Sequence, residues 1–150
     1  MERISVKIKR LKDNNDIRLP SYESEGSSGM DIRADVKAPV LLGPGDIKLI
    51  PTGLAVSVPP GYEAQIRPRS GLAFKYGIGM VNSPGTIDSD YRGEIGIILI
   101  NWGTDPFTVR RGDRIAQMII AKVYRADFVE ADDLDTTPRG KRGFGHTGIK

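Results

Sequence analysis

The sequence contains no cysteine and a single histidine. The lack of cysteine excludes disulfides, zinc–thiolate sites, iron–sulfur clusters and thiol nucleophiles, and one histidine excludes a metal site built from several imidazoles. No apolar run approaches the roughly 18 residues that span a bilayer. The charged start, residues 1–5, also lacks the apolar core of a signal peptide. We therefore expect a cytoplasmic protein without a membrane partner.

The charge is small in sum but unevenly distributed. The 150 residues fit one domain, and 22 basic against 19 acidic residues give a net charge of +3. Residues 127–135 carry five acids and no base, whereas residues 139–150 carry four bases and no acid. A basic, glycine-dense tail after an acidic stretch suggests contact with an anion. From charge alone, a solvated and frayed terminus is the simpler interpretation.

Glycine and proline divide the chain into short segments rich in β-branched residues. Apolar and polar residues alternate at Ile4, Val6 and Ile8, and residues 94–101 and 115–123 resemble more deeply buried strands. Turn signals recur between these segments, which predicts an all-β sandwich, jelly roll or barrel. One short helix is expected over residues 71–76, with Ser70 as its N-cap.

Several predicted strands are apolar on both faces, including residues 97–100 and the pair Ile119 and Ile120. One face of such a strand can fill the core of the subunit while the other meets a neighbouring chain. This pattern suggests an oligomer, although burial of both faces within one chain is equally allowed.

Five polar segments could carry chemistry: residues 28–35, 66–73, 81–94, 110–118 and 139–148. In the first, Asp31 stands between apolar residues. A buried carboxylate there needs a cation, a hydrogen-bond donor or a metal-bound water. For that segment alone, a turn aspartate paired with an arginine is the simpler interpretation.

In the second segment, Arg69, Ser70 and Gly71 precede or open the expected helix. Guanidinium, hydroxyl and free backbone N–H groups at the start of a helix can bind phosphate. An ordinary helix cap with surface arginines explains the same residues equally well.

The third segment predicts two extended stretches joined by a polar bend, which is typical of a β-hairpin. Its backbone could recognise a flat ring through N–H and C=O groups, with Tyr91 against an adjoining ring and Asp88 holding a water and taking its proton. The alternatives are aspartates that form turns, or a divalent ion held directly by Asp88 and Asp90.

The fourth and fifth segments could bind phosphate. Gln117 lies within a predicted strand and faces either a phosphate or a main-chain group. The glycine-rich residues 139–148 could cradle phosphates with backbone N–H groups. They nearly match a Walker A loop, but His146 replaces its lysine. Phe144 has no evident core to join and could stack on a ligand; an unstructured tail is the alternative.

Taken in order, the five segments closely resemble the five motifs of the homotrimeric dUTP pyrophosphatases (dUTPases), from Gly29 to Gly148. Residues 85–94 (GTIDSDYRGE) and 67–73 (RPRSGLA) are the most specific parts. The resemblance implies a distorted jelly-roll, β-clip-like barrel over residues 1–138, and a glycine-rich arm over residues 139–150 that closes the site. It also implies Mg²⁺-assisted hydrolysis of dUTP to dUMP and pyrophosphate, which limits uracil in DNA and supplies dUMP for thymidylate synthesis.

The resemblance also implies a role for each matching residue. Asp88 matches the aspartate that positions and activates the water attacking the α-phosphorus. Tyr91 matches the tyrosine beneath the deoxyribose, and Asp31 the carboxylate that reaches magnesium through water. The other matches bind substrate: Asn82, Gly85 and Ile87 line the uracil pocket, Phe144 stacks on uracil, and Arg69, Ser70, Gly71, Gln117, Arg139, Gly145 and Thr147 contact phosphates.

In this family three subunits share three sites. Each site takes the third motif from one chain, the first, second and fourth from another, and the fifth from the third. Two residues depart from the family pattern: Arg142 stands where glycine is usual, and His146 where serine or threonine is common. Arg142 either has a negative φ here or strains the closed arm.

Three other functions remain to be weighed at this point. A dCTP deaminase, or a bifunctional dCTP deaminase/dUTPase, shares the implied fold, and so would a non-catalytic nucleotide-sensing trimer. Tyr91 beside Asp88 favours the hydrolase. A nucleic-acid binder would rest on the basic ends of the chain, and the modest net charge argues against it. We therefore expect no nucleic-acid partner.

Overall fold

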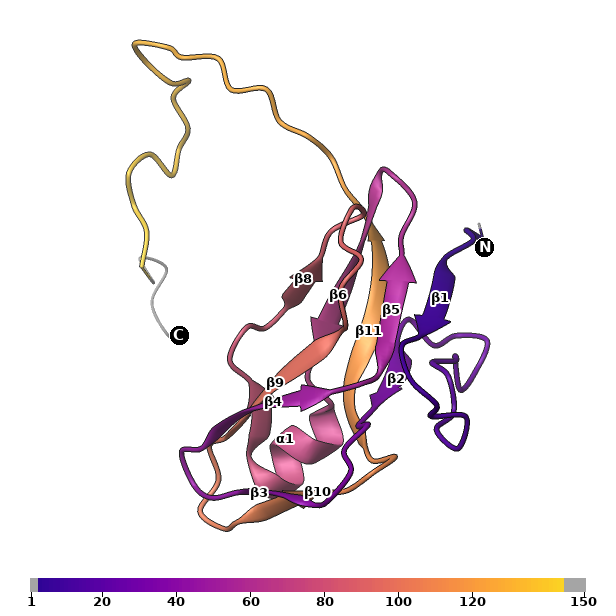
Figure 1. Cartoon of the computed structure of the whole chain (residues 1–150). Coiled ribbons are helices and arrows are strands. Elements are labelled where there is room, and N and C mark those ends of the chain that lie inside the picture. The colour runs from indigo at the N-terminus through magenta and orange to yellow at the C-terminus, as the bar shows by residue number, and fades with distance from the viewer. Residues whose placement is uncertain (1–2, 145–150) are drawn as a thin grey trace.

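The computed structural model describes residues 3–144, which form eleven strands and one short helix (Figure 1). The elements are β1 Lys7–Arg10, β2 Met30–Arg33, β3 Val40–Leu42, β4 Ile47–Pro51, β5 Leu54–Ser57, β6 Tyr62–Arg67, α1 Ser70–Tyr76, β7 Ile78–Met80, β8 Gly85–Ile87, β9 Gly96–Asn101, β10 Phe107–Val109 and β11 Arg114–Lys122. Within these residues, no helix has both the length and the apolar character needed to cross a membrane.

The strands form a four-stranded sheet, a three-stranded sheet and two strand pairs, all antiparallel. The larger sheet has the order β2-β11-β6-β8, the smaller one β4-β9-β7, and the pairs are β1-β5 and β3-β10. One apolar cluster joins them, with Ile32 and Ile66 from the larger sheet and Ile50, Ile97 and Leu99 from the smaller. Alternation along β9 sends Ile97 and Leu99 into this core and leaves Ile98 and Ile100 on the outer face.

The four-stranded sheet brings together residues that are far apart in the sequence. Gln117 on β11 lies opposite Asp31 on β2 and opposite Arg67 on β6. The neighbouring pair on the same sheet is Ile66 on β6 with Gly85 on β8. Cross-strand partners share a face of a sheet. The pairing register therefore places parts of the first, second, third and fourth motifs side by side on one sheet.

The start of the helix differs from the sequence-based expectation. α1 begins at Ser70 itself, its N-cap residue is Arg69, and no side chain there makes a capping hydrogen bond. The prediction that Ser70 is the N-cap was therefore wrong by one position. The helix ends as expected for a glycine stop: Gly77 has φ +68°, and its N–H reaches the carbonyls of Ala73 and Leu72.

The third motif does not form the paired hairpin that its sequence suggested. β8 pairs with β6 in the larger sheet, whereas β9 pairs with β4 and β7 in the smaller one. Residues 88–95 therefore connect two sheets, and the ladder that would join a hairpin is not formed between β8 and β9. The two extended stretches and the polar bend between them are present, but the stretches enter different sheets instead of pairing with each other.

After β11 the chain leaves the strands, and Figure 1 shows it running away from them toward the C-terminus. Residues 124–142, part of what we call the C-terminal segment (residues 124–144), are all exposed. The boundary expected after Pro138 stays a prediction.

Candidate active site

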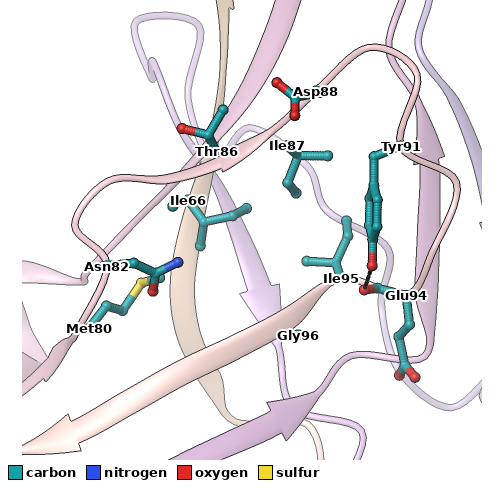
Figure 2. Close-up of a pocket in the computed structure, with 11 residues that line it drawn as sticks. Ile66, Met80, Asn82, Thr86, Ile87, Asp88, Tyr91, Glu94, Ile95 and Gly96 are labelled. Carbon is teal, nitrogen blue, oxygen red and sulfur yellow. Dashed lines mark hydrogen bonds between the residues drawn. The ribbon is translucent and has the colours of Figure 1, made fainter.

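A pocket of about 190 Å³ lies where β6, β7, β8 and the start of β9 meet (Figure 2). Its apolar walls are Ile66, Met80, Ile87 and Ile95, which are all buried. The third motif supplies most of the remaining lining, which consists of Asn82, Gly85, Thr86, Asp88, Tyr91, Glu94 and Gly96. The size suits a single ring better than a whole nucleotide.

The backbone of β8 gives this pocket its hydrogen-bonding edge. β8 is the outermost strand of its sheet and pairs on one side with β6. The N–H and C=O groups on the other side of an edge strand are not used in the sheet. They are therefore free to pair with a planar ligand, as a partner base would. Gly85 also packs closely against Asn82. A Cβ at residue 85 would lie only 3.0 Å from the side-chain amide nitrogen of Asn82, so the lack of a side chain permits this packing.

Asp88 and Tyr91 stand on the bend between the two sheets, at the open side of the pocket (Figure 2). The bend is closed by a hydrogen bond from Tyr91 N–H to the Asp88 carbonyl, 3.2 Å long. The Tyr91 hydroxyl donates to the Glu94 carbonyl at 3.0 Å. The Asp88 carboxylate is exposed, so a water molecule can reach it.

A second polar cluster consists of Asp31, Arg69 and Arg114. Arg69 Nε donates to one oxygen of Asp31 at 2.9 Å, and Arg114 Nη1 donates to the other at 3.1 Å. Arg69 also donates to the Arg114 carbonyl at 3.2 Å. The Asp31 side chain is 9% exposed, so the two arginines compensate the cost of burying its charge. With two guanidinium groups for one carboxylate, the cluster keeps a net positive charge.

The two clusters are separate within one chain. Asp31, Arg69, Ser70, Gly71 and Gln117 do not line the ring-sized pocket, whose walls come from the third motif and its neighbours. The structure thus brings Asn82, Gly85, Ile87, Asp88 and Tyr91 together at the pocket. Separately, it places Asp31 and Gln117 opposite each other on one sheet, with Arg69 bound to Asp31 from the start of α1.

The described residues do not build a metal cage on their own. Within residues 3–144 no group of three or more His, Asp or Glu side chains is placed to hold an ion. Asp31 offers one carboxylate, already hydrogen-bonded to two arginines. This donor set fits a magnesium ion held mainly by phosphate oxygens and touching Asp31 through water, because Mg²⁺ usually keeps several waters and needs few carboxylates.

A buried ionic network supports the strand that carries Asp31. Asp35 is 2% exposed and accepts from Asn14 at 2.9 Å, from Arg111 and from Lys12 at 3.3 Å. Burial raises the pKa of the Asp35 carboxyl, but the hydrogen bonds from Asn14, Arg111 and Lys12 outweigh burial and lower that pKa. Arg111 also binds Asp16, and this hydrogen bond lowers the pKa of Asp16.

The arm residues fall at the end of the described chain. Arg139 Nε donates to the Arg142 carbonyl at 2.9 Å, and the Phe144 side chain is fully exposed. Among the described non-glycine residues, Phe144 alone has a positive φ, of 49°. Arg142 therefore has a negative φ in this structure, and its conformation in the closed arm stays a prediction. Gly145, His146 and Thr147 lie outside the described residues.

Sequence reasoning missed two parts of this arrangement. Glu94 was part of the third motif but had no assigned role, yet its carboxylate accepts from Gly53 N–H at 2.7 Å and anchors the pocket wall. Arg114 lay in the fourth segment without an assigned role, and it binds Asp31. Neither contact has a local sequence signal, because each joins residues more than 40 positions apart.

Comparison with solved structures identifies the class of this fold. The dUTPase of Staphylococcus bacteriophage 80alpha, solved with dUpNHpp, superposes with a TM-score of 0.84 at 25% identity, covering 97% of this chain and 99% of that one. A mutant dUTPase from phage phi11 of S. aureus, described with a structural Mg(II) ion, has a TM-score of 0.76 at 23% identity, covering 87% and 98%. The fold and pocket thus define a jelly-roll-like nucleotide hydrolase.

The comparison of sequences is more specific. The dUTPase family model matches residues 15–148. The deoxyuridine 5'-triphosphate nucleotidohydrolase of Caldanaerobacter subterraneus subsp. tengcongensis is 57% identical over 97% of this chain and 99% of its own length. The protein of the same name from Anaeromyxobacter sp. is 53% identical over 97% and 98%. The chain belongs to the dUTPase family, which confirms the all-β jelly-roll-like fold and the dUTP-hydrolysing function expected from the five motifs.

Proposed function

We propose that this dUTPase converts dUTP to dUMP and pyrophosphate by attack of a water, held by Asp88, on the α-phosphorus. The observation that carries the proposal is the single bend that places Asp88 and Tyr91 beside a ring-sized pocket (Figure 2). The water oxygen forms a bond to the α-phosphorus as the bond to the bridging oxygen of pyrophosphate breaks. The proton of the water passes to the Asp88 carboxylate, and the electron pair leaves with pyrophosphate.

The base is selected by the edge of β8. Backbone N–H and C=O groups over Gly85–Ile87 present a fixed donor and acceptor order, which suits uracil and opposes cytosine because cytosine reverses that order. Ile87 and Ile66 line the pocket with apolar surface. In this proposal the close backbone of β8 leaves no space for the 5-methyl group of thymine. Tyr91 lies beneath the deoxyribose in this proposal, where a 2′-hydroxyl would collide with its ring.

The phosphates bind the positive cluster and its surroundings. Arg69, Ser70, Gly71 and Gln117 contact the phosphate chain in this proposal, and Asp31 keeps Arg69 in place. Asp31 would hold, through water, a magnesium ion bound to the triphosphate, and that ion would supply charge neutralisation at the phosphate oxygens. Positioning and charge neutralisation supply most of the acceleration in phosphoryl transfer.

Three observations support a homotrimer with shared sites. The pocket and the Asp31–Arg69–Arg114 cluster are separate within one chain. The outer face of the β4-β9-β7 sheet is apolar and open, with Ile47 54% exposed and Leu49 69% exposed beside Ile98 and Ile100. The C-terminal segment also exposes Phe128 at 98%. Each of these features suits completion by neighbouring copies.

The C-terminal arm closes the site over bound nucleotide in this proposal. Arg139, Gly145 and Thr147 contact phosphates, and Phe144 stacks on uracil. Closure excludes every water but the nucleophile. The reaction takes place in the cytoplasm, where it lowers dUTP available to DNA synthesis and supplies dUMP.

The first test is Asp88→Asn, assayed with dUTP and Mg²⁺. The amide keeps the size of the side chain but cannot accept the proton, so kcat should fall about 10²- to 10⁴-fold. The affinity for dUpNHpp, measured by calorimetry, should change little. The exposed carboxylate of Asp46, outside the pocket, provides the control Asp46→Asn. Pyrophosphate release that survives Asp88→Asn would remove Asp88 from the mechanism.

A nucleotide panel tests substrate choice with the native protein. dUTP should be converted to dUMP far faster than dTTP, dCTP or UTP. Ammonia released from dCTP would instead indicate a deaminase, and tight nucleotide binding without turnover would indicate a sensor.

A further inference from the structure

We infer that Gly93 is a positioning residue for sugar selection, because the absence of a side chain there provides the space in which the Tyr91 ring stands. This inference rests on the proposed role of Tyr91 beneath the deoxyribose. Gly93 itself is not among the residues that line the pocket. It acts through the ring.

Tyr91 is held at its backbone and at the hydroxyl end of its ring. Its backbone N–H donates to the Asp88 carbonyl at 3.2 Å, and its hydroxyl donates to the Glu94 carbonyl at 3.0 Å, as the dashed line in Figure 2 marks. A tyrosine hydroxyl has one proton to donate. Because Glu94 accepts it, the substrate meets the face or edge of the ring rather than a hydroxyl donor.

The hydrogen-bonded position of the ring depends on the lack of a Cβ at residue 93. A Cβ there would lie 2.5 Å from Cζ and 2.9 Å from Cε2 of Tyr91, and nearer still to its hydroxyl oxygen. These separations are far inside van der Waals contact. The backbone of Gly93 is outside the left-handed region, so a larger residue would be resisted by the ring and not by its own φ.

The acceptor of the Tyr91 hydroxyl is itself fixed to the body of the protein. The Glu94 carboxylate accepts from Gly53 N–H at 2.7 Å, and Ile95 N–H donates to the Leu54 carbonyl at 2.8 Å. The Thr52 hydroxyl donates to the Ile95 carbonyl at 2.6 Å. With Glu94 and Ile95 anchored in this way, an added methyl group at position 93 moves the ring and not the strand.

Displacement of the Tyr91 ring lowers the selectivity for deoxyribose over ribose, whether the ring moves out of the pocket or into it. If the ring moves out of the pocket, the 2′-hydroxyl of UTP gains room and UTP becomes a better substrate. If the ring moves inward, dUTP loses its place while UTP remains as poor a substrate as before. The ratio of kcat/KM for dUTP to that for UTP falls in both cases.

The experiment compares Gly93→Ala with the native protein on dUTP, UTP and dTTP. The dUTP-to-UTP ratio of kcat/KM should fall about ten- to a hundredfold. Discrimination against dTTP should stay within about twofold, because β8 selects the base. The matched control is Gly26→Ala, which adds the same methyl group where no atom lies within 4 Å. It should leave both ratios unchanged.

A double-mutant cycle separates an effect through the ring from a general disturbance. Gly93→Ala should lower the sugar ratio in the native background and leave it unchanged in a Tyr91→Ala background. An equal loss in both backgrounds would overturn the inference, and so would an unchanged ratio in Gly93→Ala alone. If the native protein does not prefer dUTP to UTP, the proposed role of Tyr91 fails first, which distinguishes the two failures.

Discussion

The pocket and the C-terminal segment of this dUTPase differ in how much of their structure one chain supplies. Met80, Ile87 and Ile95 of the pocket are at most 8% exposed, and strands on both sides fix their positions. In the C-terminal segment, Tyr124 is 87% exposed and Leu134 is 86% exposed. Burial decides the geometry of the first region, whereas the second carries apolar residues that find no place in their own chain.

This difference has a functional consequence. Recognition of a small planar base requires donors and acceptors that are already in place, and a pocket built from buried strands provides them. Closure over a triphosphate requires a segment that is not committed to the core of its own subunit. The two regions therefore suit the two stages of the proposed reaction, binding of the base by the pocket and enclosure of the phosphates by the arm.

Among the changes that test this comparison of the two regions, removing the arm should have the largest effect. A chain truncated after Pro138 should fold and assemble as the native protein does, because β11 and the core end before that point. Its kcat/KM for dUTP should fall at least about a hundredfold, since charge neutralisation and exclusion of water are lost together. Circular dichroism, light scattering and pyrophosphate release check the three parts.

Two outcomes of the truncation would break the comparison. Full activity would show that residues 139–150 do not take part in the reaction. A truncated chain that becomes monomeric would show that these residues hold the subunits together. That result would contradict the idea that residues 1–138 assemble without the arm. A shorter truncation after Lys141 keeps residues 139–141, so comparison of the two truncated chains separates the contribution of these three residues from that of residues 142–150.

The next largest effect concerns the buried ionic network around Asp35, which lies outside the C-terminal segment. Asp35→Asn should lower the free energy of unfolding by about 2 kcal/mol, because charged hydrogen bonds from Arg111 and Lys12 are lost while both cations keep part of their hydration. Denaturant unfolding measures the change. The truncated chain should show the same loss, since none of the described arm residues, 139–144, is a hydrogen-bond or ion-pair partner of this network.

The pH dependence follows from the direction of the pKa shift. The pKa of Asp35 is lower in the folded protein than its ordinary value, so its stabilisation is complete above that ordinary value. The stabilisation is lost as the pH falls through the folded-state pKa. The difference between native protein and Asp35→Asn should therefore be constant from about pH 5 to 8 and shrink below about pH 4. A difference that persists undiminished at low pH would contradict this origin.

The same contrast between local and distant contacts explains how far the sequence could be interpreted. Strands β9 and β11 lie where the apolar segments 94–101 and 115–123 predicted them, because runs of apolar residues between turn residues are local properties. The pairing of β8 with β6 instead of β9 is not local, and the expected hairpin was wrong for that reason. Asp88 and Tyr91 both line the pocket, and the sequence could bring them together because their motif is contiguous. Arg114 was missed because its partner Asp31 lies 83 positions away.

The smallest expected effect is at Ser70, where local reasoning erred by one position. As an N-cap, Ser70 would contribute about 1 kcal/mol to stability through its hydroxyl. Since it is the first helical residue and no capping bond forms, Ser70→Ala should change the free energy of unfolding by less than about 0.5 kcal/mol. The KM for dUTP should nevertheless rise about tenfold, because a hydrogen bond to a charged phosphate is lost.

Ser70→Thr provides the matched variant, because it keeps the hydroxyl and adds one methyl group at an exposed position. It should restore most of the affinity for dUTP and leave stability near that of the native protein. A large loss of stability in Ser70→Ala would mean that the hydroxyl supports the helix after all. A KM unchanged in both variants would assign phosphate binding at this turn to Arg69 and the backbone N–H groups, without the hydroxyl.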